Sequence, residues 1–302
     1  MIDQPPRDWT GRDDGPGAEH ARWHHVVNAA SADAPVAIVG FASDEGVRRN
    51  LGRQGAAGGP AALRAMLANL AEPGVQVADL GDVVVADRDL EAGQQRLGAV
   101  VGAVLGRGAV PVVLGGGHAV AYGSALGWLP RTESWGVLNL DAHLDLRKAE
   151  RATSGTPFLQ LADDHAAAGR PFHYSVIGLS RPSNTRALFE TADRLGVPIL
   201  SDVDTEVSSA VAAAEALIDR VDRVHLTLDL DVLPASVAPG VSAPAALGVV
   251  APSVILAVLR AVAASGKLGL FEVAELNPLF DPDARTARTA ARCVDEVVRH
   301  LP

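Results

Sequence analysis

The chain has little sulfur, few aromatic side chains and no excess of positive charge. A single cysteine, Cys293, excludes a disulfide within the chain and is compatible with the reducing cytoplasm. Lys and Arg number 26 against 36 Asp and Glu, and no basic stripe is visible, so nucleic acid is not an expected partner. Nothing resembles a signal peptide, and no apolar run is long enough to span a bilayer. We therefore expect a cytoplasmic protein with no membrane partner.

Aromatic residues make up only 4% of the chain although 48% of it is hydrophobic, so a core must be built from Val, Leu and Ala. The 302 residues are enough for one large α/β domain. Residues 1–34 begin with a stretch rich in Asp, Gly, Pro and Arg, which predicts an extended N-terminal segment, with Trp9 as its anchor. No linker or change of composition follows, so residues 35–302 are predicted to form a single domain.

From Pro35 onward, apolar runs rich in β-formers alternate with helical stretches rich in Ala and Leu. This spacing is typical of βαβ units, with parallel strands buried on both faces and right-handed crossovers. Eight such units fit an open sheet or a closed barrel, and the pattern alone does not choose between them. The predicted strands are 35–41, 75–80, 109–114, 135–140, 173–179, 197–200, 223–230 and 268–274. The predicted helices are 60–70, 91–106, 118–128, 157–168, 184–195, 207–220, 252–264 and 285–300.

Three metal-type ligands stand within five residues in Asp-Ala-His-Leu-Asp, residues 141–145, directly after the apolar run 135–140. Alternate side chains at the end of a strand share a face, so Asp141, His143 and Asp145 are expected to converge. The carboxyl ends of parallel strands border the crevice where such sheets bind ligands. A polar loop that only caps the next helix would explain one Asp, but not three ligands at steps of two.

Two further stretches complete a ligand set. Asp229 and Asp231 end the apolar run 224–232, and His118 follows a strand that breaks into three glycines. Six ligands are too many for one catalytic zinc and suit two divalent ions, for which a carboxylate-rich set with two imidazoles favours Mn²⁺. Two ions roughly 3.5–4 Å apart can hold a water between them as hydroxide. The predicted metal ligands are His118, Asp141, His143, Asp145, Asp229 and Asp231.

Gly-Gly-Gly-His, Asp-Ala-His-Leu-Asp and Asp-Leu-Asp-Val, in this order, resemble the metal signatures of the arginase, agmatinase and formimidoylglutamase superfamily of ureohydrolases. Within it, the flanking sequence most resembles the formimidoylglutamases, hydrolases of histidine degradation, from about Trp9 to the carboxyl terminus. The segments that carry this finer resemblance are 44–56, 153–158, 178–185 and 273–278. The resemblance implies an α/β fold with an open, mainly parallel eight-stranded sheet in a three-layer α/β/α sandwich. It also implies assembly into a homo-oligomer.

The resemblance further implies an activity for the domain 35–302. A hydroxide bridging two Mn²⁺ ions would cleave N-formimidoyl-L-glutamate, a small molecule, to L-glutamate and formamide. The superfamily places a glutamate at the position of Glu275, which would hold the amidine. Our own candidate for relaying a proton to the leaving nitrogen is Asp145, a ligand that can also contact the bridging oxygen. Glu272 stands three residues before Glu275, so in a strand it faces the other way. Arginase-like enzymes place a proton-carrying histidine where this chain has Phe158, so the resemblance leaves the proton carrier open.

The implied substrate has two carboxylates, which planar guanidinium groups bind through paired hydrogen bonds. Arg181, at the carboxyl end of a predicted strand, is the preferred candidate, with Arg53 as a second. Asn184 is suited to capping a helix, to binding substrate, or to both. Ser154 and Thr156 would bind substrate or only shape a turn. The predicted substrate-binding residues are Arg181, Asn184, Arg53, Asn50, Ser154 and Thr156.

Three alternatives remain at this point. A related ureohydrolase that acts on a guanidino acid, agmatine or arginine would need the same metals. A binuclear metallophosphoesterase is disfavoured because no Gly-Asp-x-x-Asp motif is found and because paired Asp229 and Asp231 are foreign to it. A non-catalytic metal-binding relative would have no reason to keep all six ligands together with Glu275.

Overall fold

A single sheet of eight strands organises the chain in the computed structural model, which describes residues 1–27, 31, 33–245, 247–249 and 251–302. The strand order is β2-β1-β3-β8-β7-β4-β5-β6, and all seven pairings between strands are parallel. The strands are β1 (Val36–Ala42), β2 (Val77–Val84), β3 (Val110–Leu114), β4 (Trp135–Leu140), β5 (His173–Leu179), β6 (Ile199–Ser201), β7 (Arg223–Asp229) and β8 (Leu268–Ala274). Because β2 and β6 are its two edges, the sheet is open and the barrel alternative is wrong.

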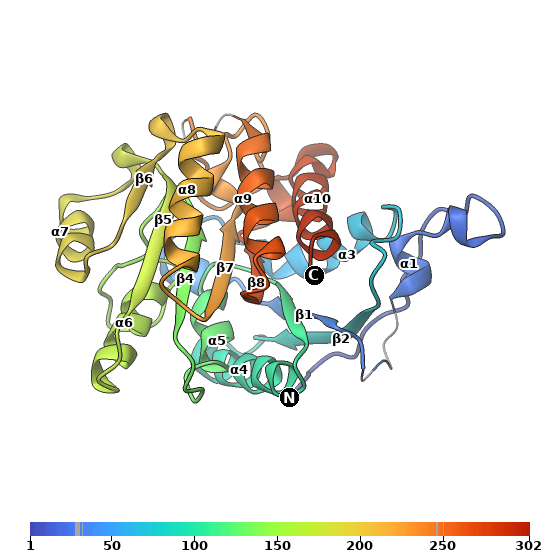
Figure 1. Ribbon diagram of the computed structural model, residues 1–302, viewed down its shortest axis with the longest axis horizontal. Coiled ribbons are helices and arrows are strands. Elements are labelled where there is room, and N and C mark those ends of the chain that lie inside the picture. The colour runs from blue at the N-terminus through green and yellow to red at the C-terminus, as the bar shows by residue number, and fades with distance from the viewer. Residues whose placement is uncertain (28–30, 32, 246, 250) are drawn as a thin grey trace.

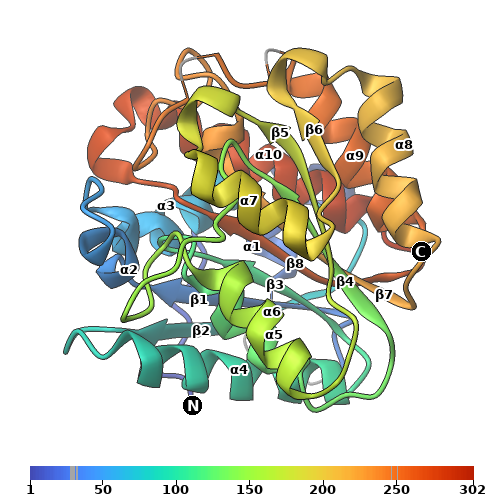
Figure 2. The ribbon, with the colours of Figure 1, turned by 90° about the vertical axis from the view of Figure 1, so that its left-hand side faces the viewer.

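Helices cover both faces of the sheet, so the fold is the predicted three-layer α/β/α sandwich (Figures 1 and 2). One face is covered by α3 (Gly59–Leu67), α8 (Val207–Ile218), α9 (Pro252–Ala264) and α10 (Arg285–Arg299). The other is covered by α4 (Leu90–Gly106), α5 (Val120–Leu126), α6 (Pro157–Ala167) and α7 (Arg186–Leu195). Since the crossovers place helices on both faces, central strands such as β4 and β8 are buried on both sides, as the continuous apolar runs predicted. The edge strand β6 is only half-buried.

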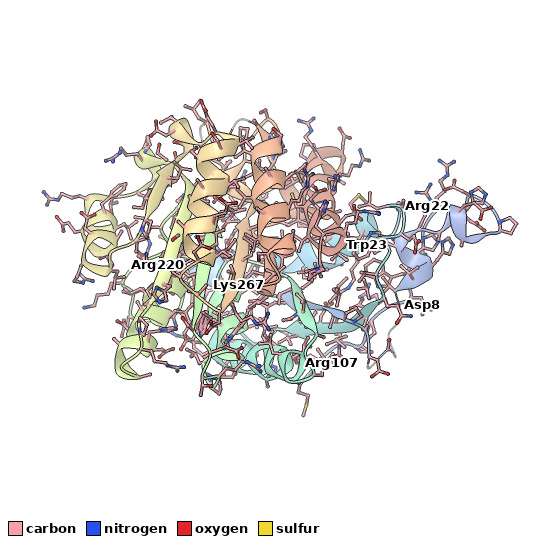
Figure 3. All side chains as sticks on the ribbon, viewed as in Figure 1. Asp8, Arg22, Trp23, Arg107, Arg220 and Lys267 are labelled. Atoms are coloured by element: carbon pink, nitrogen blue, oxygen red, sulfur yellow. The ribbon has the colours of Figure 1, made fainter. Side chains whose placement is uncertain are left out.

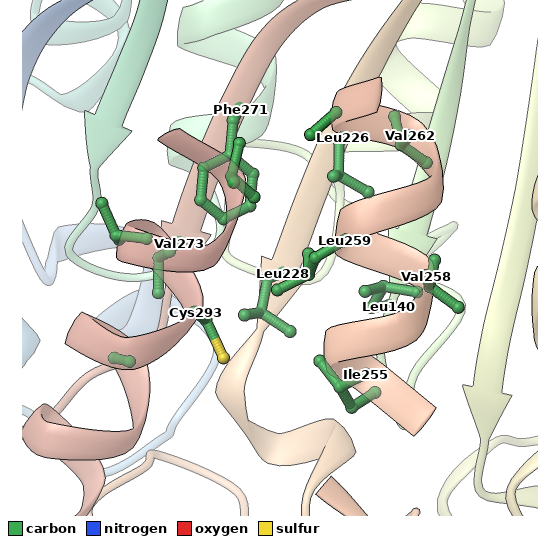
Figure 4. Packing of buried hydrophobic residues seen from close by; sticks show 14 of the residues in the cluster. Leu140, Leu226, Leu228, Ile255, Val258, Leu259, Val262, Phe271, Val273 and Cys293 are labelled. Carbon is green, nitrogen blue, oxygen red and sulfur yellow. The ribbon is translucent and has the colours of Figure 1, made fainter. Parts of the chain in front are cut away.

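Helix α9 illustrates how sequence spacing becomes packing. Its buried side chains Ile255, Val258, Leu259 and Val262 follow the i, i+3, i+4, i+7 pattern of one helix face. In Figure 4 this face packs over β7 and β4, and α10 lies beside it with the buried Cys293. A core of short aliphatic side chains therefore joins the central strands to the outer helices.

The N-terminal segment is more structured than the predicted extended chain. It contains a 3-10 helix at Ala18–His20 and the short helix α1 (Trp23–Val26), because the Trp23 ring is buried and its Nε1 donates to Asp295 Oδ1 at 2.8 Å. Trp9 stacks on Trp23 with ring centroids 6.3 Å apart, and donates to Asp79 Oδ2 at 2.8 Å. Figure 3 labels Trp23 where this segment meets the body of the protein. Residues 28–30 and 32 of the predicted segment lie outside the described residues.

The segment 43–59, between the predicted strand 35–41 and the predicted helix 60–70, also contains structure that periodicity did not reveal. It includes α2 (Glu45–Arg49) and a 3-10 helix at Ala56–Gly58, both too short to show a hydrophobic repeat. In the described part of the chain, no helix is long and apolar enough to cross a membrane.

The four central strands, β3, β8, β7 and β4, lie side by side. Because they are parallel, the residues that follow them in the chain meet at one edge of the sheet. His118 follows β3, Glu275 follows β8, Asp231 follows β7, and residues 141–145 follow β4. The fold therefore brings together four segments that are widely separated in sequence.

Candidate metal centre and substrate cavity

His118 lies at the centre of a cluster of carboxylates. Its Nδ1 is 2.9 Å from Asp145 Oδ2, 3.1 Å from Asp229 Oδ2 and 3.2 Å from Asp141 Oδ2. This buried nitrogen is not aligned for a hydrogen bond with any of them. Three carboxylate oxygens around one imidazole nitrogen form a set of ligands that a divalent cation would satisfy.

A second group adjoins the first. His143 Nδ1 lies 3.0 Å from Asp231 Oδ2 and 3.4 Å from Asp141 Oδ1. The ligand atoms of His118, Asp141 and Asp145 lie within 4.8 Å of one another, as do those of Asp141, His143 and Asp231. The two groups share Asp141, whose two oxygens face different histidines. This arrangement fits two neighbouring ions with a shared carboxylate.

The charges of this cluster are balanced by protons when no cation is bound. Burial lowers the pKa of His118, but its contacts with Asp141, Asp145 and Asp229 outweigh burial and raise that pKa well above its usual value. The charge of Asp231 raises the pKa of His143. Burial, and then the neighbouring Asp231 and Asp141, raise the pKa of Asp229 well above the normal carboxyl range. Divalent cations would replace these protons as the source of positive charge.

The glycines before His118 allow the backbone to enter a crowded position. A Cβ at Gly116 would stand 1.9 Å from the carbonyl oxygen of Ser43, and one at Gly117 would stand 2.3 Å from Val47 Cγ2. Only glycine fits there. The His118 ring is then oriented by a 3.0 Å contact between its Nε2 and Thr227 Oγ1 on β7. Such a partner for the second ring nitrogen orients a metal-binding histidine.

Glu275 occupies the floor of the site in a strained backbone conformation. Its φ is 69°, in the left-handed region that non-glycine residues rarely adopt, and the φ of Asp145 is 46°. Glu275 Oε1 accepts a hydrogen bond from His118 N at 2.7 Å, while its buried Oε2 has no hydrogen-bond partner among the described residues. Burial is the main cause that raises the pKa of Glu275 to about 8. Glu272 does not line this site: it is fully buried 2.9 Å from His225 Nε2.

A cavity of about 330 Å³ opens above this cluster. Glu275 and five of the six predicted metal ligands line it, whereas Asp141 lies fully buried behind them. Its outer end is formed by the loops around Asn50, Arg147, Ser154 and Ser242. One cavity therefore has an anionic inner end, built on strand ends, and an outer end built on loops.

Asn50 and Ser154 both line the cavity, as expected for residues that could bind substrate. Asn50 Nδ2 donates to Ser154 Oγ at 3.1 Å, which links their two segments. Thr156 is different and does not line the cavity. Its hydroxyl donates to Gln160 Oε1 at 2.8 Å and accepts from Thr153 N at 3.0 Å, so it shapes the turn.

The preferred carboxylate ligand of the sequence prediction lies elsewhere. Arg181 is exposed, does not line the cavity, and stacks over the Phe189 ring at 5.1 Å. The 3-10 helix Arg181–Ser183 turns this side chain away and brings Ser183 and Asn184 to the cavity instead. The placement expected for Arg181 from its position after a strand is therefore wrong.

Asn184 lines the cavity but uses its amide on the backbone. Its Oδ1 accepts from Leu144 N at 3.0 Å, and its Nδ2 donates to the carbonyl oxygens of Ala142 and Ser180, each at 2.9 Å. These bonds hold the loop that carries His143. Asn184 is thus arranged to position this loop, and its contact with substrate stays a prediction, since it also lines the cavity.

Arg53 lines the outer end with its guanidinium already engaged. Its Nε donates to the carbonyl oxygen of Ser242 at 3.1 Å, its Nη2 to that of Val241, and the group lies 4.4 Å from the Phe280 ring centroid. Arg53 joins two walls of the cavity, which the sequence did not indicate.

Arg147 is the cavity-lining arginine that the substrate prediction missed. Its side chain is exposed and has no hydrogen bond or ion pair with any described residue, although its backbone N donates to the carbonyl oxygen of Gly155 at 2.8 Å. A Cβ at Gly155 would meet Arg147 Nε at 3.2 Å and Asn50 Nδ2 at 3.4 Å, so these donors face the same space. Its place two residues after the Asp-Ala-His-Leu-Asp motif was the available signal.

Phe158, which stands where arginase-like enzymes were expected to have a histidine, packs behind the site. Its ring is fully buried, meets the His118 ring edge-on at 5.4 Å between centroids, and stacks on Tyr174 at 4.5 Å. It provides an apolar wall and no group that can carry a proton.

An open parallel sheet that gathers carboxylates and imidazoles at the ends of adjacent strands defines the class of α/β metallohydrolases. The arginase family pattern matches residues 34–299, and the chain belongs to this family. Formimidoylglutamases are among its similar relatives. That of Rhodococcus jostii is 54% identical over 97% of this chain and 95% of its own length, and that of Nocardia farcinica is 51% identical over 99% and 98%.

A solved structure of Trypanosoma cruzi formiminoglutamase with Mn²⁺ is similar in fold. Its TM-score is 0.82 at 28% identity, and the match covers 91% of this chain and 97% of that one.

Proposed function

We propose that this chain hydrolyses N-formimidoyl-L-glutamate to L-glutamate and formamide, using two Mn²⁺ ions. The observation that carries this proposal is the distribution of charge in one cavity. Carboxylates line its inner end, and the guanidinium of Arg147, which has no partner among the described residues, stands at its outer end. An amidine head with a dicarboxylate tail matches both ends. The names of the relatives that span almost the whole chain, formimidoylglutamases, support the same substrate.

The six predicted ligands are proposed to hold the metal ions in two groups. Asp141 contributes to both, joined by His118 and Asp145 in one and by His143 and Asp231 in the other. Asp229 approaches the first group through its contact with His118. When bound, the two ions supply a nucleophile from water at neutral pH and neutralise the buried carboxylates.

Glu275 is proposed to hold the amidine. Its free oxygen Oε2 is buried and lies at the cavity floor, where it can accept hydrogen bonds from the N–H groups of the substrate head. Without substrate, burial is the main cause that raises the pKa of Glu275 to about 8, and a cationic amidine beside it would favour the ionised carboxylate. The pair keeps the formimidoyl carbon electrophilic and fixes its orientation.

Asp145 is proposed to move the proton. It lines the cavity beside the ligand cluster, so its carboxylate can take a proton from the attacking water and deliver it to the nitrogen that leaves with glutamate. The new bond joins the water oxygen to the formimidoyl carbon, and the bond that breaks joins that carbon to the glutamate nitrogen. Formamide and L-glutamate then account for all atoms.

Arg147, with Asn50 and Ser154 beside it, is proposed to bind the substrate carboxylates. An arginine has no use against the cationic tail of agmatine, so these groups also favour an acidic substrate. The direct test is an assay for formamide or urea release from N-formimidoyl-L-glutamate, arginine, agmatine and guanidinobutyrate, with and without added Mn²⁺. We expect Mn²⁺-dependent release of formamide from the first compound. Activity on guanidinobutyrate alone would replace this proposal with a ureohydrolase that acts on a guanidino acid.

A further inference from the structure

A nearly buried arginine, Arg49, joins three segments behind the outer end of the cavity. Only 7% of its side chain is exposed, against 5% for its partner Glu45. Its Nε donates to Glu45 Oε1 at 2.8 Å, and its Nη1 donates to Glu91 Oε1 at 2.7 Å and to the carbonyl oxygen of Ala152 at 2.9 Å. Its Nη2 donates to Glu91 Oε2 at 3.1 Å and to the carbonyl oxygen of Arg88 at 3.0 Å. All three guanidinium nitrogens are therefore engaged.

These bonds connect three segments that are not joined to one another by pairing within the sheet. Glu45 and Arg49 belong to α2, Glu91 to the first turn of α4, and Ala152 to the loop that follows the Asp-Ala-His-Leu-Asp motif. Arg48 adds a bidentate pair with Glu45 at 2.7 Å for both bonds. The planar fork of an arginine is suited to such a junction, because it meets several acceptors in fixed directions.

Two of the joined segments carry the groups that line the outer end of the cavity. Asn50 follows Arg49 directly, and Ser154 stands two residues after Ala152. Arg147 belongs to the same loop, which is closed by the bond from its backbone N to Gly155. A Cβ at Gly46 of α2 would stand 3.0 Å from Ser154 N, which shows how closely the helix and the loop approach. A displacement at Arg49 would therefore reach the proposed carboxylate-binding groups.

The carboxylates of this junction stay ionised in the neutral range. The hydrogen bond from Arg48 is the largest cause that lowers the pKa of Glu45, to about 2, and Arg49 adds to it. Burial raises the pKa of Glu91, but hydrogen bonds from Arg49 and Arg151 outweigh it and lower that pKa to about 2. The charges that hold the junction are therefore retained throughout the neutral pH range.

We propose that Arg49 is a positioning residue for substrate specificity: it holds Asn50, Arg147 and Ser154 at the spacing that binds the acidic tail. The inference rests on the proposed function for the nature of that tail. None of the candidate metal ligands is bonded to Arg49 in the described structure, since they stand on the ends of β3, β4 and β7 and on the residues that follow. Arg49 thus sets the affinity for substrate and leaves the reacting end unchanged.

The test is steady-state kinetics of the Mn²⁺-loaded Arg49→Met variant on N-formimidoyl-L-glutamate, with metal content measured on the same samples. We expect KM to rise at least about tenfold with kcat within about twofold, because small misplacements of binding groups are costly. Arg49→Lys keeps the positive charge but lacks the planar guanidinium group. Its KM should therefore lie between that of the unchanged protein and that of Arg49→Met.

Arg64 offers a matched control. It is a similarly buried arginine, 12% exposed, that bonds Asp79, Asp82 and the Gly81 carbonyl oxygen, and none of these four residues lines the cavity. Arg64→Met should lower thermal stability to a comparable degree and leave KM unchanged. An equal rise of KM in both variants would show a general loss of structure and overturn the inference, as would a lower kcat with unchanged KM in Arg49→Met.

Glu91→Gln keeps the experiment decisive if Arg49→Met does not fold. The Glu91 side chain is 43% exposed, so this change removes one charge from the junction without opening the core. We expect a KM increase of about threefold, and no increase would contradict the inference. Absence of formamide release by the unchanged protein would instead refute the proposed function, and KM for its true substrate would then be compared in the same variants.

Discussion

The two ends of the cavity are held in place by different kinds of structure. At the inner end, the groups stand on or directly after four adjacent strands, and His118, Asp141, Asp229 and Asp231 are at most 2% exposed. At the outer end, the groups stand on loops and on the end of a short helix, and Leu51 at the rim is 94% exposed. The sheet dictates the position of the reacting groups, whereas side-chain bonds between loops dictate the position of the substrate-binding groups.

This difference separates chemistry from specificity in physical terms. A strand end cannot shift without disturbing the hydrogen bonds of the sheet, so the sheet restrains the segments that carry the candidate metal centre. A loop held by Arg49 or Arg53 can be repositioned by changing a few side chains. Mutations at the two ends should therefore have different effects, which three variants test. A fourth test uses the pH dependence of the inner end.

The largest effect is expected from Asp229→Ala. Loss of this carboxylate removes a proposed ligand and leaves His118 with one fewer acidic neighbour, so turnover should fall to the level without enzyme. The measurement is kcat for formamide release together with bound Mn²⁺. Asp204→Ala, at an exposed carboxylate outside the cavity, is the control and should behave like the unchanged protein. Full activity of Asp229→Ala would show that this proposed metal ligand is not needed for turnover and would contradict the proposed role of the inner end.

The next effect is expected from Arg147→Met, which should raise KM about tenfold to a hundredfold with little change in kcat, as for one lost charge-assisted hydrogen bond. Arg181→Met is the matched comparison, since Arg181 lies outside the cavity over Phe189. Its KM should remain within about twofold of the unchanged value. The reverse ranking in the same kinetic assay would restore the sequence-based choice of Arg181.

A smaller effect is expected from Asn184→Ala, which removes three bonds to the backbone around the candidate metal loop. Mn²⁺ affinity should fall about tenfold, as for other groups that orient metal ligands, while KM measured at saturating Mn²⁺ changes little. Competition with a chelator measures the affinity. Ser183→Ala, at the neighbouring residue on the same cavity wall, should leave Mn²⁺ affinity unchanged. A large increase of KM alone in Asn184→Ala would assign Asn184 to the substrate.

The smallest effect concerns pH. Burial is the main cause that raises the pKa of Asp231 from 3.8 to about 6 and that of Glu275 from 4.5 to about 8. A carboxyl with a raised pKa in the folded state destabilises the metal-free fold as pH rises from the unfolded value through the folded one. Mn²⁺ needs the ionised ligands, so the gain in Tm on adding Mn²⁺ should grow from about pH 5 to about pH 8. A gain that shrank over this range would contradict the proton balance described for the cluster.

The alternation of apolar runs was enough to predict eight strands, but not their edges or order. The strand predicted at 75–80 extends over Val77–Val84, and the one at 197–200 is Ile199–Ser201. The short helix α2 was missed because five residues carry no measurable period. Strand order depends on how distant segments pair, which a local pattern does not contain, so the choice of an open sheet over a barrel needed the family resemblance or the structure.

By itself, the sequence determined which segments would meet at the inner end. The apolar run 135–140 placed Asp141, His143 and Asp145 directly after a strand, which is a property of neighbouring residues. Their convergence does not follow from strand alternation, because β4 ends at Leu140 and Asp145 has a φ of 46°. Only the tertiary structure decided the outer end, where Arg181 turns away, Arg147 faces the cavity, and Asn184 holds a backbone loop. The direction of a long side chain on a loop is decided by partners far away in the chain, and no local spacing encodes them.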